Sequence, residues 1–152
     1  MVEKVIRAAR ELSLEIEVKR LERPTRTVAE AAEAVGADPA QIAKSLVFLS
    51  DGDPVVAVVS GAHRADMDLL AEAFDCAEVT QASPDDVRAA TGFAVGGVPP
   101  FGHSLPVVFD ESLCDHVLIY AAGGDGNTLI AVEPKALARA INARIIQIGD
   151  RV

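Results

Sequence analysis

Two apolar runs separated by a short polar turn constrain the fold of this chain most strongly. "LVFLS" ends at residue 50 and "PVVAVVSG" begins at residue 54, with Asp51, Gly52 and Asp53 between them. An Asp-Gly pair between two runs rich in β-branched residues is the strongest short-range signal of a β-hairpin. The sequence therefore predicts a hairpin whose first strand is buried.

Helix and strand signals alternate on both sides of this hairpin. Thr27 stands three residues before Glu30 and Gly36 ends the same segment, which is the pattern of a capped helix. Ser83 with Pro84, and Asp38 with Pro39, are typical of two more helix starts. Further helices are expected over residues 2–12, 66–74 and 133–142, and further strands over 14–18, 78–81, 105–110, 116–122, 127–133 and 143–149.

Hairpins mixed with helices indicate an α/β (α+β) fold with a mixed, largely antiparallel sheet or barrel-like core flanked by helices. A chain of 152 residues is long enough to bury a sizeable core, so we expect residues 1–152 to form one domain.

The net charge is -9, from 14 basic and 23 acidic residues. Proteins that bind a long stretch of nucleic acid make many contacts from Lys or Arg to phosphates, so this negative net charge argues against a DNA-binding protein. Four basic residues nevertheless fall within eight positions: Lys19, Arg20, Arg23 and Arg26. Such a run is either a solvated segment or a contact for the phosphate-bearing end of a ligand.

No window approaches the roughly 20 apolar residues of a membrane span, and the N-terminal residues mix both charge signs. We therefore expect a cytoplasmic protein without a membrane partner.

The common local motifs of hydrolases, metalloproteases and nucleotide-binding proteins are missing from the sequence. His63, His103 and His116 lie far apart, and Cys76 and Cys114 have no metal-like spacing. These observations predict no metal site and no cofactor. An adjacent pair, His103 as base and Ser104 as nucleophile, leaves a small-ester hydrolase as a weaker alternative.

Lys44 is one of four lysines and stands beside the apolar run 46–49. We expect it at the end of a short helix that leads into the buried strand. The side chain then either extends to water near the helix end or holds an ammonium at the rim of an apolar pocket, ready for a phosphate or a carbonyl oxygen.

The segment "GGVPPFGH", residues 96–103, combines glycines, prolines and Phe101. Glycines allow the main chain to approach a ligand, and main-chain N–H groups in a rigid loop can bind one oxygen. The alternative is a tight surface loop whose phenylalanine fills the core. A second stretch, "AAGGDGN" at residues 121–127, forms either a facing wall or a hairpin turn.

These motifs, taken in order, resemble the YbaK and prolyl-tRNA-synthetase-associated editing-domain family. The resemblance rests on Thr27, "IAKSL" around Lys44, "PVVAVVSG", "SPDDVRAATGF", "GGVPPFGH", "LPVVFDESL", and "AAGG" followed by "EPKALARAINARI". It covers roughly residues 20 to 150 in collinear order.

The resemblance implies a free-standing aminoacyl-tRNA deacylase that removes a small amino acid such as alanine, cysteine, serine or 2-aminobutyrate from mischarged tRNA, here expected to be tRNA-Pro. It also implies a metal-independent reaction in which the terminal ribose hydroxyl and a water take part. The tRNA acceptor end would be the partner, together with a prolyl-tRNA synthetase. The alternative is a non-catalytic module that binds tRNA or a synthetase.

On this resemblance Lys44 holds the terminal nucleotide or the reacting ester. The substrate-binding residues expected around it are Thr27, Gly97, Val98, Pro100, Phe101, Gly102, His103, Asp110, Gly123 and Gly124. Lys19, Arg20, Arg23 and Arg26 would contact the tRNA.

Two of these residues have several readings. His103 could orient a water, contact the α-amino group or hydrogen-bond its own loop. Asp110 could bind an α-amino group or cap the next helical turn.

Overall fold

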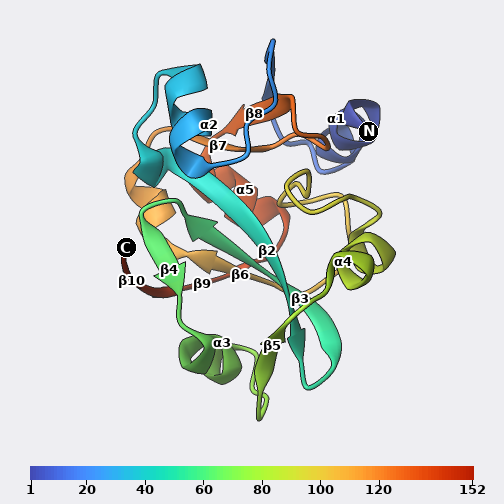
Figure 1. Cartoon of the computed structure of the whole chain (residues 1–152), viewed down its shortest axis with the longest axis vertical. Helices are drawn as coiled ribbons and strands as arrows, with labels where there is room; N and C mark the ends of the chain where they lie inside the picture. The colour runs from blue at the N-terminus through green and yellow to red at the C-terminus, as the bar shows by residue number, and fades with distance from the viewer.

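The computed structural model describes all residues, 1–152, and has a mixed sheet at its centre (Figure 1). The strand order is β1-β8-β7-β2-β3-β6-β9, and β5 also pairs with β2. The main strands are β1 (Glu17–Arg20), β2 (Ile42–Ser50), β3 (Asp53–Ser60), β5 (Val79–Gln81), β6 (Val107–Asp110), β7 (Ile119–Ala122), β8 (Thr128–Val132) and β9 (Arg144–Ile146). The helices are α1 (Val2–Glu11), α2 (Val28–Val35), α3 (Met67–Ala73), α4 (Pro84–Thr91) and α5 (Pro134–Ala140), with short 3-10 helices η1 (Pro39–Gln41) and η2 (Glu111–Asp115).

The hairpin expected from the sequence is confirmed as β2 and β3, paired over eight residues from Ala43↔Ser60 to Ser50↔Asp53. Asp51 and Gly52 form its turn with φ of 47° and 90°. Two successive positive φ angles give the turn that matches the right-handed twist of paired strands. The Asp51 carboxylate also accepts the N–H groups of Ala77 and Glu78, which joins this turn to the start of β5.

The expected mixed, largely antiparallel sheet is also confirmed. Five strand pairs are antiparallel and three, β2 with β7, β3 with β6 and β6 with β9, are parallel. One antiparallel pair, β4 (His63–Ala65) with β10 (Gly149–Arg151), forms a separate small sheet that the sequence analysis missed. The sequences of these two strands, His-Arg-Ala and Gly-Asp-Arg, have no alternation of apolar and polar residues that could reveal them.

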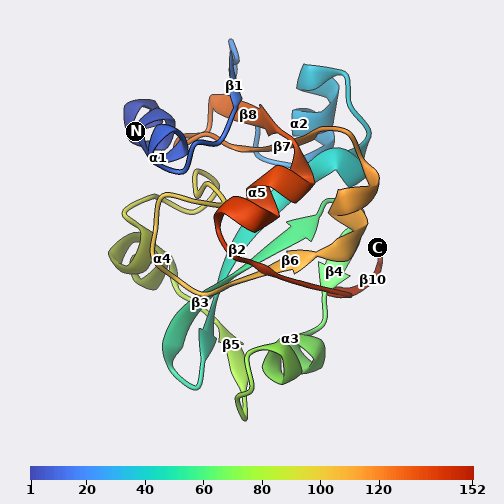
Figure 2. The same ribbon diagram turned by 180° about the vertical axis from the view of Figure 1, so that it is seen from behind.

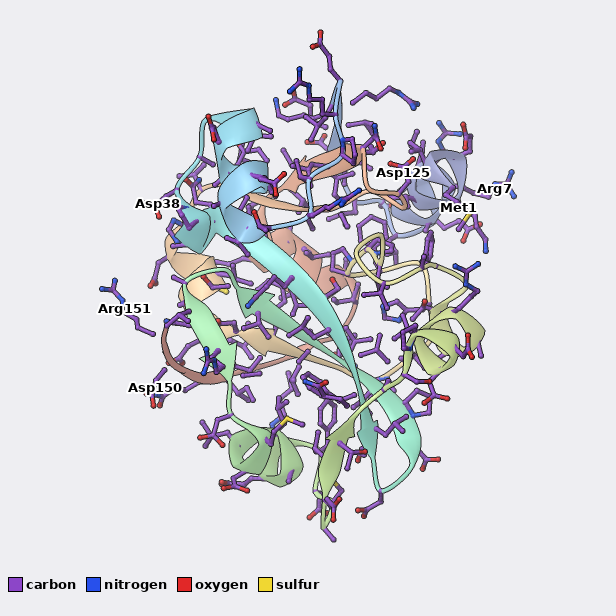
Figure 3. All side chains as sticks on the ribbon, in the orientation of Figure 1. Met1, Arg7, Asp38, Asp125, Asp150 and Arg151 are labelled. Carbon is purple, nitrogen blue, oxygen red and sulfur yellow. The ribbon has the colours of Figure 1, made fainter.

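Both faces of the central hairpin are covered, which explains its uninterrupted apolar sequence. Val56 and Val58 of β3 pack in the largest core cluster with residues of α1 and α5, whereas Val55, Ala57 and Val59 pack with Leu70 of α3. α2 lies in front of the start of β2 in Figure 1, with α3 below the sheet, and α5 lies in front of the sheet in Figure 2. None of the helices has the length and apolar character needed to cross a membrane.

The helix caps follow the sequence closely. The Thr27 hydroxyl accepts the N–H of Glu30 at 3.1 Å, and Gly36 ends α2 in the left-handed conformation. The Thr27 hydroxyl donates to the Glu30 carboxylate, in place of the reciprocal main-chain bond of a capping box. Ser83 and Asp86 form a complete capping box at the start of α4.

Several expected boundaries differ from the structure; the strand expected over residues 116–122, for example, begins at Ile119. The helix expected to reach Lys44 ends at Gln41, and Lys44 is the third residue of β2. Pairing of the apolar run with β3 decides this local conformation, because strand preference depends on cross-strand packing. The strand expected over residues 14–18 begins only at Glu17, although Leu14 is buried in the core.

Gly61, directly after β3, fixes how closely this strand approaches α2. A Cβ atom there would collide with the Val28 side chain and lie 2.5 Å from the carbonyl oxygen of Pro39. We predict that Gly61→Ala lowers the free energy of unfolding by about 1–3 kcal/mol, since α2 must move away. Urea unfolding measures this loss.

Gly126→Ala is the matched control, because a Cβ there meets its nearest neighbour, Pro24, at an ordinary 3.6 Å. Equal unfolding midpoints for the two variants would contradict this tight packing of the β3 end against α2.

Candidate active site

A half-open pocket of about 430 Å³ lies along one edge of β2. Fifteen of its 22 lining residues are hydrophobic. Its walls are residues 25–28 and Ala31 around the start of α2, residues 42–48 of β2, residues 120–122 of β7, and Val95, Gly96 and Val98 of the loop after α4. Figure 1 shows β2 running diagonally between α2 and this loop. An apolar pocket with a few polar groups is the usual form of a small-molecule site.

The pocket lies where the sheet is interrupted. On the side of β2 away from β3, β7 pairs only with Ile42 and Ala43, and β5 pairs only with residues 48–50. No strand pairs with residues 44–47 on that side.

The direction of the main-chain groups in this gap follows from the pairing of β2 with β3. The Gly61 N–H donates to the Ile42 carbonyl at 2.7 Å, and alternate residues of an antiparallel strand turn toward the same neighbour. The peptide groups of Ser45 and Val47 therefore face away from β3, toward the pocket. Unpaired strand groups of this kind are available to a bound ligand.

Lys44 is one of two cationic residues that line the pocket, and Arg26 is the other. The Lys44 ammonium donates to the main-chain carbonyl of His63 at 3.2 Å and is partly buried. Burial lowers the pKa of Lys44 below its ordinary value of 10.5, the positive charge of Arg64 lowers it further, and the negative charge of Asp110 opposes both. Partial desolvation strengthens the interaction of this ammonium with any oxyanion that a substrate develops.

Asp110 anchors a polar network behind Lys44. Its carboxylate is 1% exposed and is within hydrogen-bond distance of four donors: the main-chain N–H groups of Ser60 and Ser112, the hydroxyl of Ser112, and Nδ1 of His63 at 2.9 Å. The sequence left two roles open for Asp110, and the structure has it as a helix cap, since Asp110 is the N-cap of η2. Asp110 is not among the residues that line the pocket.

The glycine loop divides between two surfaces. Gly96 and Val98 line the pocket beside Lys44. Gly97 packs against the main chain of Gly124, where a Cβ atom would lie 2.9 Å from the carbonyl oxygen.

The second half of this loop lies away from the pocket, in contrast to the expectation that the whole segment faces Lys44. Pro100, Phe101, Gly102 and His103 line a separate groove against α1. The Phe101 side chain is 1% exposed and belongs to the main core, which is the alternative reading of this loop. Burial of this ring draws the chain inward and separates its two halves.

His103 bonds within its own loop. Its Nδ1 accepts the N–H of Leu105 at 3.3 Å, and its buried Nε2 has no partner. Burial lowers the pKa of His103, which favours the neutral ring. No hydrogen bond joins His103 to Ser104, so the nucleophile-base pair of a small-ester hydrolase is not assembled.

The second glycine stretch forms a hairpin turn between β7 and β8. Gly123 donates to the Thr128 carbonyl, and Gly124 has a φ of 107°. Ala121 and Ala122, rather than the two glycines, line the pocket. Gly124 still supports the site through its contact with Gly97.

The basic segment ends at the pocket. Leu21 and Thr25 donate to the carbonyls of Asn127 and Gly126, and Arg26 and Thr27 then line the pocket. Lys19 on β1 forms an ion pair with Glu17, whereas no ion pair involves Arg20, Arg23 or Arg26.

Sequence reasoning missed two residues of the site. Ser45 lines the pocket, and its hydroxyl is buried without a hydrogen-bond partner. A serine within an otherwise apolar strand was the signal that could have found it. His63 was recognised only as an isolated histidine, because its contact with Asp110 joins residues 47 positions apart.

The partly buried ammonium of Lys44 has a cost for folding. Its pKa is lower in the folded chain than in the unfolded chain, so the charged form destabilises the fold below that pKa. We predict that Lys44→Met raises the urea midpoint at neutral pH and that this gain shrinks as the pH rises toward 10.5.

Lys135→Met, at an exposed position of α5, is the matched control and should change the midpoint little at any pH. A gain for Lys44→Met that did not vary with pH would show that the charge is not its cause.

Comparisons with known proteins agree with this architecture. Residues 22–140 match the family model described as "Aminoacyl-tRNA editing domain". The chain is 37% identical to a solved structure described as "Crystal structure of a putative trans-editing enzyme for prolyl tRNA synthetase", with a TM-score of 0.92 over 98% of this chain and 96% of the other.

Curated relatives include the "Uncharacterized protein YwhH" of Bacillus subtilis, 35% identical over 82% of this chain and 80% of its own length. The "Putative Cys-tRNA(Pro)/Cys-tRNA(Cys) deacylase EbsC" of Enterococcus faecalis is 29% identical over 79% of this chain and 75% of its own length. A proline--tRNA ligase of Geobacter metallireducens is 30% identical over 74% of this chain, but the matched part is only 20% of that ligase. The match over most of its length shows that this chain belongs to the aminoacyl-tRNA editing domain family.

Proposed function

We propose that this protein is an aminoacyl-tRNA deacylase, which hydrolyses the ester between a small mis-attached amino acid and the 3′ end of a tRNA. The observation that carries the proposal is the partly desolvated ammonium of Lys44, a residue that lines an apolar pocket at the open edge of β2, in a chain of the editing-domain family.

For this reaction the protein needs only to position the ester and to stabilise the negative charge that develops on it. A water attacks the ester carbonyl, a tetrahedral oxyanion forms, and the bond to the ribose oxygen breaks. The Lys44 ammonium is a donor for the developing oxyanion or for the terminal phosphate, and main-chain N–H groups at the β2 edge offer further donors. The ribose hydroxyl of the substrate and the attacking water carry the proton transfers.

The apolar lining beside β2 supports a small amino acid. Gly96, Val98, Ala121 and Val87 surround the space beside β2. A rigid apolar wall admits a short side chain and excludes a longer one by steric clash. We expect alanine, cysteine, serine or 2-aminobutyrate to be released from the tRNA, and proline to stay attached to it.

Contact with the acceptor end follows from the basic segment. Arg20, Arg23 and Arg26 lead along the outside of the molecule to the pocket, and Lys19 stands at their start. These few phosphate contacts are compatible with a net charge of -9, because only the end of the tRNA is bound and weak binding favours turnover.

The names of the relatives support tRNA-Pro as the substrate and a prolyl-tRNA synthetase as the functional partner. We expect residues 1–152 to act as one editing unit in the cytoplasm, where aminoacyl-tRNA is made.

The central test is deacylation of tRNA-Pro charged in turn with alanine, cysteine, serine, 2-aminobutyrate and proline. We predict selective release of one or more of the small amino acids, and a loss of about 100-fold or more in rate for Lys44→Ala, because the oxyanion loses its main cationic donor. Lys135→Ala on α5 is the matched control.

Two results would contradict the proposal. Full turnover by Lys44→Ala would show that the assignment of the site is wrong. Binding of every charged tRNA without release of any amino acid would show that the protein is a tRNA-binding module rather than an enzyme.

The rate should also depend on pH in a defined direction. If the ammonium is required, activity is complete while Lys44 is protonated and falls as the pH rises through its lowered pKa, below the ordinary value of 10.5. The measurement is kcat/KM against pH, after subtraction of the spontaneous ester hydrolysis seen without protein. A profile that keeps rising through this range would mean that neutral Lys44 is the active form.

A further inference from the structure

We infer that His63 is a positioning residue for Lys44: its ring is held by the buried Asp110 carboxylate, so that its main-chain carbonyl keeps the ammonium at the pocket. This inference rests on the proposed function for its effect on activity. The positioning itself is a property of the fold and can be measured separately.

The hydrogen bonds of Asp110 determine which nitrogen of the neutral His63 ring carries the proton. The Ser112 hydroxyl donates to Asp110 Oδ1 at 2.8 Å, which leaves Asp110 Oδ2 as the acceptor for Nδ1 of His63 at 2.9 Å. The proton of the neutral ring therefore lies on Nδ1, where the Ser112 oxygen at 3.3 Å is a second, weaker acceptor. Nε2 makes no hydrogen bond, so the ring is fixed through one nitrogen only.

The same residue carries the anchor of Lys44. The His63 carbonyl accepts the Lys44 ammonium at 3.2 Å, and no other hydrogen bond of that ammonium is present. His63 pairs with Arg151 across the short β4–β10 sheet, which holds the main chain from the opposite side. The Gly61 N–H, which donates to the Ile42 carbonyl, and the Ala62 N–H, which donates to the Ser60 hydroxyl, also hold the turn before His63. The bond between the ring and Asp110 is the contact that fixes His63 itself through its side chain.

Asp110 ties this arrangement to the central sheet. It is the last residue of β6, and its Oδ2 also accepts the N–H of Ser60, the last residue of β3. Removal of the His63 ring leaves a buried carboxylate with one donor fewer, and the turn between Ser60 and His63 can then relax. Such a displacement moves the Lys44 anchor without disturbing the apolar walls of the pocket.

The charges around the network explain why this bond affects Lys44. The positive charge of Arg64 and the negative charge of Asp110 act on the ammonium in opposite directions. A shift of the His63 carbonyl releases the ammonium toward water, where it is farther from the ester. We therefore expect a loss in kcat with little change in KM, since most of the binding surface stays in place.

The test compares two substitutions at one position. His63→Asn keeps an N–H donor at the place of Nδ1 but has no counterpart of Nε2, whereas His63→Leu keeps bulk and removes the donor. We expect a fall in kcat of about tenfold or more for His63→Leu, and a value within about threefold of wild type for His63→Asn. His116→Leu is the control for loss of a partly buried histidine outside the network.

A second readout does not need turnover. The chain has four lysines, so reductive methylation with a carbon-13 label gives few enough signals to assign and titrate by NMR. The pKa of Lys44 should rise toward its ordinary value in His63→Leu, because the released ammonium becomes solvated, and should stay at the wild-type value in His63→Asn.

If the wild-type protein hydrolyses no charged tRNA, the proposed function fails while this titration still tests the inference. Two results overturn the inference itself. One is that His63→Leu has the same kcat and the same Lys44 pKa as the wild-type protein. The other is a His63→Asn variant as impaired as His63→Leu, because the ring would then be required for more than its Nδ1 donor.

Discussion

The pairing of β2 with β3 is the constraint on which the rest of the structure depends. It converts an apolar run into a strand covered on both faces, and it decides that Lys44 and Ser45 lie on opposite faces of that strand. It also fixes which peptide groups of β2 point into the sheet and which point into the pocket. The position of the site thus follows from a strand register.

The site needs contributions from distant parts of the chain because it uses few polar side chains. The ammonium comes from β2, its anchor from the turn after β3, and the carboxylate behind that anchor from the end of β6. Each of these groups lies on or directly beside a strand, so the main-chain bonds of the sheet fix the residues next to it.

The sequence predicted the elements whose signals are local: the Asp51–Gly52 turn, the caps at Thr27, Asp38 and Ser83, and Lys44 as the side chain of interest. The sequence did not predict features whose position depends on contacts between residues far apart in the chain. Phe101 lies within the glycine loop in the sequence, but its burial places the end of that loop on another surface. The role of His63 depends on a carboxylate 47 residues away, which no spacing rule can reveal.

The interruption beside β2 also bears on how the protein avoids sticking to copies of itself. Exposed strand edges are templates for pairing with other chains, and long apolar ones promote aggregation. Here the open stretch spans only residues 44–47, and β7 and β5 close it at both ends. An intruding strand would find too few main-chain partners to bind stably. The open stretch is therefore long enough for a small bound group to reach the bare peptide groups, but too short for a neighbouring polypeptide to pair with them stably.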